Sequence, residues 1–206
     1  MFTLITDGSI TKHISGNRGI TLGDIQYPKS IFTLWSAAER EAISIYEVVF
    51  DDSNKKDEAY YINTNQSYTF ANDTVTASYG TATAKAHADT TWSQDDEDAG
   101  DLPSDKSVND IKTRGLKYNL IKTVKSQAAG ILANTDWYIT RNAEKSTAIP
   151  SAITTHRDLV RSRQATMETQ ITNASDTPAL ETLYTYTTDS DGVQSRPLAK
   201  LPTLEI

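Results

Sequence analysis

Residues 111–134 read IKTRGLKYNLIKTVKSQAAGILAN, and their apolar side chains recur at the spacing of an α-helix. The apolar positions of this stretch are Ile111, Tyr118, Ile121, Val124, Ala128 and Ile131. Its basic side chains lie on the other faces of such a helix. Ser104 or Ser107 can cap the first turn, and Asn134 is a suitable polar residue at the end. The pattern predicts a helix from one of these serines to Asn134.

A second helical pattern follows Pro150, which can occupy the first turn of a helix. Its apolar residues recur at intervals of seven, seven and four residues, at Ile153, Val160, Met167 and Ile171. We expect a loop between Tyr138 and Pro150, so that the two helices form an antiparallel hairpin. Pro178 is expected to end this unit, before a short strand at Leu183–Thr187 and a turn at Asp189–Gly192.

The first part of the chain, residues 1–92, is predicted to be mostly β-structure with one helix. The Asp7–Gly8 and Asn72–Asp73 pairs are typical of tight turns in β-hairpins. Apolar residues at helical spacing predict a helix over Ile31–Ala42. The β-branched and aromatic residues of Ala42–Phe50 then predict a strand.

Charge marks a segment between these two parts. The 206-residue chain has a formal net charge of -7, but residues 93–110 alone carry seven acidic side chains and one basic one. Residues 111–174 carry ten basic and four acidic side chains. We expect residues 93–110 to form a solvated acidic linker. A calcium site at Asp95–Asp98 is the alternative, although the run lacks the spaced ligands and central glycine of a calcium loop.

These patterns together predict an α+β chain. Its expected parts are a β-rich unit with one helix at residues 1–92, the acidic linker at 93–110, a helical hairpin unit at 111–188 and an extended tail at 189–206. Hydrophobic residues make up 37% of the chain, which is low for one core of this length. Small units with modest cores fit this composition better than one large domain.

The composition gives no support to catalysis or to a bound cofactor. The chain has no cysteine, so it has no thiol nucleophile, disulfide or thiolate metal ligand. Its three histidines, His13, His87 and His156, are far apart in the sequence. Neither a nucleotide-binding glycine pattern nor a nucleophile elbow occurs. We therefore expect no enzyme activity, no cofactor and no metal site.

The sequence favours protein partners over membranes and nucleic acids. Its longest apolar stretch, Ala42–Phe50, is interrupted by Glu47 and is much shorter than the roughly 18 residues of a membrane span. The first residues lack the pattern of a secretory signal, so none is expected. The basic residues of 111–174 could contact phosphates. They are spread along both predicted helices beside an acidic linker, however, so we expect no nucleic-acid binding.

Aromatic residues of the second predicted hairpin leave a further alternative open. They are Tyr60, Tyr61, Tyr68, Phe70 and Tyr79. Packing between neighbouring strands is the simpler interpretation. If exposed, the same residues could form an interaction face or a platform for carbohydrate.

Trp137 lies where the first predicted helix ends, and two interpretations apply to it. In the first, Trp137 folds back onto the second helix, and Asp136 forms a charge-assisted pair with Arg157 or Arg161. Truncation of Trp137 would then cost about 3–5 kcal/mol. In the second, Trp137 is a hot spot for a partner, a role for which tryptophan and arginine are favoured.

Two segments, ILANTDW at Ile131–Trp137 and HRDLVR at His156–Arg161, resemble a pattern of bacteriophage tail proteins. In that pattern T-D-W follows a leucine-rich helix end, and a loop leads to a helix with Y-R-x-x-L-R. In this respect the chain resembles the tail assembly chaperone family and small tail and tail-fibre proteins of marine and cyanobacterial phages. His156 stands where the pattern has tyrosine. The resemblance singles out Thr135, Asp136, Trp137, His156, Arg157 and Arg161 as interaction or structural residues.

The resemblance implies a structural component of a phage tail, a connector or anchor associated with a tail fibre or baseplate. It implies other tail proteins as partners, an oligomer within the tail, and a location in the virion after assembly in the host cytoplasm. One alternative is a tail-fibre assembly chaperone that is absent from the mature virion. Another is a receptor- or glycan-binding module.

Overall fold

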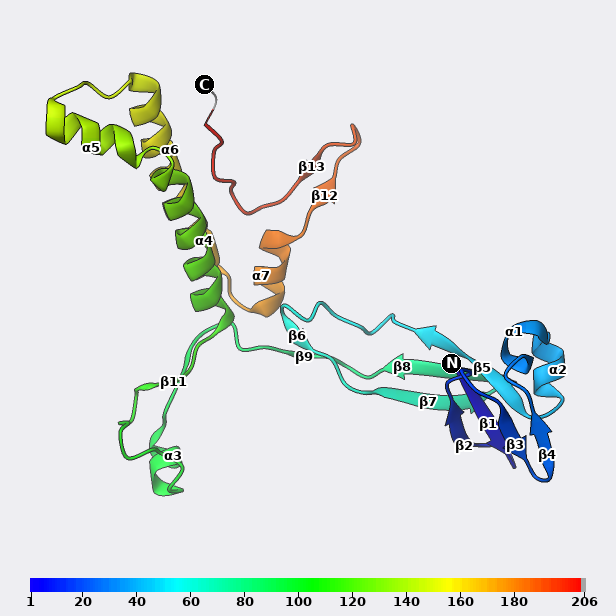
Figure 1. Cartoon of the computed structure of the whole chain (residues 1–206). Coiled ribbons are helices and arrows are strands. Elements are labelled where there is room, and N and C mark those ends of the chain that lie inside the picture. Colours follow the sequence, from blue (N-terminus) through cyan, green and yellow to red (C-terminus); the bar gives the residue numbers. More distant parts are fainter. Residues whose placement is uncertain (205–206) are drawn as a thin grey trace. The chain divides into compact units, whose positions relative to one another are not determined.

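The computed structural model describes residues 1–204 and divides the chain into two compact units, Met1–Thr83 and Ala84–Ile206 (Figure 1). The first unit is built around a β-sheet and the second around helices, so the chain is α+β, as predicted. The division falls after residue 83 and not after residue 92. Residues 84–92 therefore belong with the helical unit.

The first unit contains a five-stranded sheet in the order β2-β1-β5-β8-β7. The strands are β1 (Phe2–Thr6), β2 (Ser9–Ile14), β5 (Ile45–Asp51), β7 (Gln66–Ala71) and β8 (Thr74–Tyr79). Neighbours are antiparallel, except that β5 and β8 are parallel. The two hairpins turn at Asp7–Gly8 and Asn72–Asp73, where all four residues have positive φ. Both predicted turns are confirmed, and their geometry is that of two-residue hairpin loops.

The sheet is strongly curved. His13 of β2 and Tyr68 of β7 belong to its two edge strands, yet their ring centroids are 4.4 Å apart. A cluster on one face buries Ile5, Val48, Val75 and Ala77. Tyr68 and Phe70 pack against this cluster, as the interpretation of cross-strand packing requires.

The remaining elements of residues 1–84 are short: β3 (Ile20–Leu22), β4 (Ile25–Tyr27), α1 (Ile31–Leu34), α2 (Ala37–Glu41), β6 (Tyr61–Ile62) and β9 (Thr83–Ala84). A second cluster buries Phe2, Ile14, Ile20, Ile31, Phe32 and Ile45, and so joins the sheet to α1 and the β3–β4 hairpin. The strand predicted from Ala42 is β5, which begins three residues later.

The single helix predicted over Ile31–Ala42 is wrong, because α1 and α2 are separate helices. Trp35 between them has an extended backbone, with ψ 144°. Ser36 then caps α2: its hydroxyl accepts a hydrogen bond from the Glu39 amide at 3.3 Å. In return, the Glu39 carboxylate accepts one from the Ser36 amide at 2.7 Å. This reciprocal pair stabilises a new helix start inside the apolar pattern.

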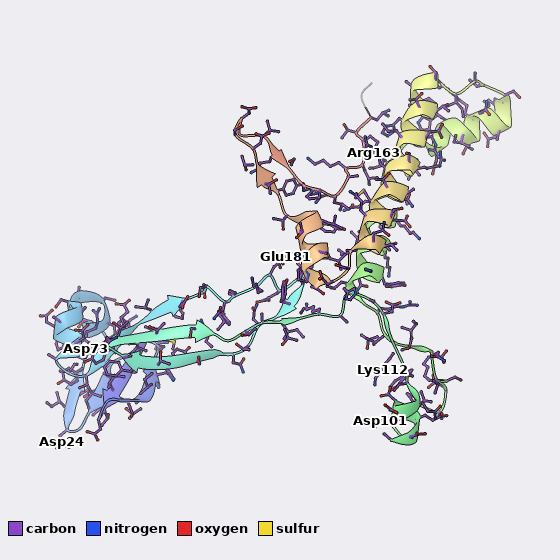
Figure 2. All side chains as sticks on the ribbon, turned by 180° about the vertical axis from the view of Figure 1, so that it is seen from behind. Asp24, Asp73, Asp101, Lys112, Arg163 and Glu181 are labelled. Carbon is purple, nitrogen blue, oxygen red and sulfur yellow. The ribbon has the colours of Figure 1, made fainter. Side chains whose placement is uncertain are left out.

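Residues 90–113 form an arm with its own secondary structure. Most side chains of the acidic segment within it, residues 93–110, are exposed, as a solvated segment requires, but the regular elements of the arm are not predicted. Its elements are β10 (Thr90–Thr91), α3 (Gln94–Asp98) and β11 (Ile111–Thr113), and β10 pairs with β11. Lys112 lies 2.6 Å from the Asp96 carboxylate and 4.4 Å from the centre of the Trp92 ring. The hydrogen bonds from Lys112 and Ser93 lower the pKa of Asp96 to about 2. Figure 2 shows the arm with Lys112 and Asp101 labelled.

Helices form the rest of the second unit: α4 (Leu116–Ala133), α5 (Asp136–Lys145), α6 (Ser151–Asn173) and α7 (Thr177–Tyr184). A short hairpin of β12 (Thr187–Thr188) and β13 (Gln194–Ser195) follows. Helices α4 and α6 run antiparallel, because Lys117 bonds the Thr172 carbonyl while Lys125 lies 3.3 Å from Glu168. The buried residues include Val124, Ala128, Val160, Met167 and Ile171, which are positions that the periodicity predicts.

Three predicted boundaries in this unit are wrong. Helix α4 begins at Leu116, because residues 111–113 pair as a strand. Helix α5 covers residues 136–145, although the sequence predicts a loop from Tyr138 onward. Pro178 lies in the first turn of α7 and does not end the unit, because Asp176 caps this helix through a 2.8 Å bond from the Ala179 amide. The strand expected from Leu183 is therefore partly helix.

The segment after β13 is held against α6 and α7. The Gln170 side chain donates to the Pro197 carbonyl at 2.9 Å and accepts from the Ala199 amide at 3.0 Å. Between these contacts, Leu198 is 1% exposed, and its amide bonds the Leu183 carbonyl. The predicted tail is therefore part of the packing of the helical unit.

We expect a fragment of residues 84–206 to fold alone and a fragment of residues 104–188 to be much less stable. The shorter fragment lacks the Lys85 carbonyl, which accepts a 2.6 Å hydrogen bond from Thr177. It also lacks Leu198, and the loss of one such buried leucine side chain costs about 2–5 kcal/mol. Thermal melting of both fragments, followed by circular dichroism, is the measurement. Equal melting temperatures would contradict this view of the unit.

Candidate functional site

The strongest candidate site is the corner at which α4 ends and α5 begins. Only Asn134 and Thr135 separate the two helices. Thr135 is 2% exposed, and its hydroxyl donates a 2.9 Å hydrogen bond to the Leu132 carbonyl, one turn back in α4. The Thr135 amide donates to the same carbonyl at 3.0 Å, so both donors of the threonine satisfy a carbonyl at the helix end. The threonine therefore fixes the point at which the chain changes direction.

Arg157 reaches this corner from α6. Its Nη1 donates to the Leu132 carbonyl at 2.8 Å and to the Thr135 hydroxyl at 2.6 Å. Its Nη2 lies 2.9 Å from Asp136 Oδ1. One guanidinium thus holds three groups of the corner. Its planar array of N–H donors binds several acceptors in fixed directions, which a lysine ammonium group does less well. Of the two arginines that the sequence offers for Asp136, the structure selects Arg157.

Helix dipoles favour both charges of this pair. Arg157 lies at the C-terminal end of α4, where a positive charge is stabilised, and Asp136 lies in the first turn of α5, where a negative charge is stabilised. The Arg157 side chain is 9% exposed, whereas that of Asp136 is 61% exposed. Solvent screening therefore limits the contribution of the carboxylate. The buried hydrogen bonds to Leu132 and Thr135 contribute more.

Trp137 does not pack across the helical hairpin, and the first interpretation of this residue is wrong. It is 51% exposed. Its ring contacts that of Tyr138, with centroids 3.7 Å apart and the planes tilted by 32°. The guanidinium carbon of Arg141 lies 4.7 Å from the centre of the Trp137 ring. The corner is closed by Thr135 and Arg157, and about half of the Trp137 surface is open to solvent. Ile139, also on α5, is 42% exposed.

His156 and Arg161 are the remaining residues that the resemblance singles out, and neither joins the hydrogen bonds between Arg157, Thr135 and Asp136. His156 is buried and lines a hollow of about 290 Å³ with Ile131, Asn134, Thr135 and residues 201–204. Arg161 is 53% exposed and contacts Asp158 on its own helix at 3.4 Å. The structure therefore brings together Thr135, Asp136 and Arg157 and leaves Arg161 outside.

Tyr138 and Arg141 were missed by sequence reasoning, although the signal was present. Arg141 follows Trp137 by four residues, which is the spacing of side chains that contact each other on a helix. That signal has meaning only if residues 136–145 are helical, and the sequence predicts a loop from Tyr138 onward. The three side chains Trp137, Tyr138 and Arg141 are called the aromatic–arginine cluster below.

No reaction is suggested by this site. Its polar groups are bonded to one another around the corner, and the cluster beside it consists of two partly exposed rings and an arginine. Residues 1–204 hold no group of three or more His, Asp or Glu side chains that could bind a metal ion. In the same part of the chain, no helix has both the length and the apolar character of a membrane crossing. Comparison of the chain with protein-family models, curated proteins and solved structures gives no match.

Proposed function

We propose that this chain is a structural component of a bacteriophage tail, where it connects or anchors other tail proteins through the aromatic–arginine cluster. The observation that carries the proposal is the half-exposed Trp137 beside a corner that buried hydrogen bonds fix in place. The same residues carry the T-D-W resemblance to phage tail proteins. The proposed partner is another tail protein, and the proposal includes no catalysis, no cofactor and no nucleic acid.

The physical chemistry of the cluster supports a role in protein binding. Tryptophan, tyrosine and arginine are the residues most enriched among binding hot spots. Arg141 lies over both rings, 4.7 Å from the centre of Trp137 and 5.4 Å from that of Tyr138. This contact restrains the indole before binding, so less side-chain entropy is lost when a partner covers it. Burial of these rings in a partner's pocket would also remove a large apolar area from water.

The direct test is mass spectrometry of purified particles of a phage that encodes the chain. A structural component is expected in every particle, at a fixed ratio to the other tail proteins. If the chain is abundant in infected cells but missing from purified particles, the proposal is wrong and the assembly chaperone is favoured. Crosslinking within the particles would identify the neighbouring protein for the next experiment.

We expect Trp137→Ala to weaken binding to that neighbour by about thirtyfold, or about 2 kcal/mol, as for a hot-spot residue. The unfolding free energy should change by only about 1 kcal/mol or less, because the indole is half exposed. Biolayer interferometry gives the affinity, and urea unfolding gives the stability. Tyr186→Ala is the matched control, because Tyr186 is a 50% exposed aromatic of the same unit. An unchanged affinity for Trp137→Ala would count against the cluster as the binding surface.

A further inference from the structure

The first unit contains a pocket whose lining is basic. It has a volume of about 420 Å³ and is lined by residues 12–15 and 18–21, at the end of β2 and the start of β3. The lining includes Lys12, His13 and Arg18, and it contains no acidic residue. The volume lies within the range of pockets for small ligands.

The local charge is opposite to that of the surrounding unit. Residues 1–83 carry six Lys and Arg against ten Asp and Glu, whereas residues 8–23 contain no acidic residue at all. Lys12 and Arg18 are exposed, and neither forms an ion pair with any of residues 1–204. Their charges are therefore available to a ligand and not neutralised within the protein.

The loop between Lys12 and Thr21 is fixed to the core beneath it. A Cβ at Gly16 would lie 3.0 Å from the ring of the buried Phe2, and a Cβ at Gly19 would lie 2.6 Å from the Tyr27 carbonyl oxygen. The backbone at both glycines thus packs more closely than other residues allow. Ser15 donates a 2.6 Å hydrogen bond to Asn17 within the same loop. A loop held in this way presents its polar groups in one arrangement, which lowers the entropy cost of binding.

We propose that this pocket binds an oxyanion, a phosphate or carboxylate group, on a molecule about the size of a monosaccharide. Arg18 is expected to bind the oxyanion with paired donors and Lys12 to supply a second charge. His13, whose ring contacts that of Tyr68, also lines the pocket. The site is independent of the proposed role in a tail, because it uses residues 1–83 and none of the corner.

The test is NMR titration of the ¹⁵N-labelled full chain with glucose 6-phosphate, inorganic phosphate, glucuronate and glucose. We expect saturable shifts confined to residues 12–21, with a Kd in about the millimolar range, for at least one anionic probe and not for glucose. Shifts with the two phosphate probes assign the ligand as a phosphate, and shifts with glucuronate alone assign it as a carboxylate.

Arg18→Gln is expected to weaken binding about tenfold or more, because a charge-assisted hydrogen-bond pair is lost. Lys12→Gln should weaken it as well. The matched control is Lys56→Gln, which removes the same charge from an exposed position of the same unit outside the pocket. Three outcomes would overturn the proposal: no saturation up to about 10 mM of any anion, equal shifts with glucose, or parent-like binding by the Arg18→Gln variant with a native spectrum.

Discussion

Replacement of Arg157 by alanine is expected to lower the unfolding free energy of the helical unit by about 3–4 kcal/mol. The guanidinium is largely buried and holds the Leu132 carbonyl, the Thr135 hydroxyl and the Asp136 carboxylate. Its loss removes hydrogen bonds to a charged donor and leaves a cavity at the corner. A loss of this size is a large part of the roughly 5–15 kcal/mol that stabilises a typical domain. Urea unfolding followed by circular dichroism measures the change.

Two neighbouring substitutions separate the role of the corner from that of charge alone. Arg161→Ala removes the same charge one turn further along α6, and it should cost about 0.5 kcal/mol or less because its contact with Asp158 is exposed. Asp136→Asn should cost about 1 kcal/mol or less for the same reason. If Arg157→Ala and Arg161→Ala destabilise the unit equally, the guanidinium does not hold the corner as described.

Periodic patterns and turn pairs are the part of the fold that the sequence predicts well. The facing positions of α4 and α6 repeat every three, four or seven residues, and residues such as Val124 and Val160 are buried as expected. The Asp7–Gly8 and Asn72–Asp73 turns were found because few residues adopt the positive φ that two-residue hairpins require. Each of these signals lies within a short stretch and needs no knowledge of distant contacts.

The elements that were missed depend on single polar contacts. Ser36 and Glu39 begin a helix inside a pattern that otherwise predicts one continuous helix. Asp176 caps α7 where the sequence predicts the end of the helical unit, and Lys112 pairs with Asp96 of α3 in a run of acidic residues. A side chain that caps or pairs is worth about 1 kcal/mol, which is enough to choose between two local structures of similar energy. Sequence periodicity does not reveal which of these contacts will form.

The dependence on single polar contacts also explains why the sequence predicts only part of the α4–α5 corner. Proximity of Asp136 to an arginine of the second helix could be predicted from opposite charge and the expected hairpin, and Arg157 forms that pair. The exposure of Trp137 could not be predicted, because the corner is closed by hydrogen bonds between Arg157, Leu132 and Thr135. These contacts join residues more than 20 positions apart, and no short-range pattern reveals them.

Gly115→Ala is expected to destabilise the helical unit by about 3 kcal/mol, the upper part of the range for inserting one methyl group where there is no space. Gly115 is the N-cap of α4, with φ -81° and ψ 175°, a conformation that alanine adopts readily. The cost is therefore steric: the new Cβ would lie 2.3 Å from the Ala88 carbonyl carbon and oxygen. Because both atoms belong to the backbone, the chain segments around Ala88 and Gly115 must move apart.

That movement would disturb the hydrogen bonds through which the arm meets α4. The Gly115 amide donates to Asp89 at 2.8 Å, and the Leu116 amide donates to the Ala86 carbonyl at 3.0 Å. Gly130→Ala is the matched control, because it is the same substitution in the same helix at a position with no atom within 4 Å of the new Cβ. It should stabilise the unit by about 0.5–1 kcal/mol through helix propensity. We expect urea unfolding to give a lower unfolding free energy for Gly115→Ala and a higher one for Gly130→Ala. Equal changes in the two variants would show that the base of the arm is not packed against Gly115.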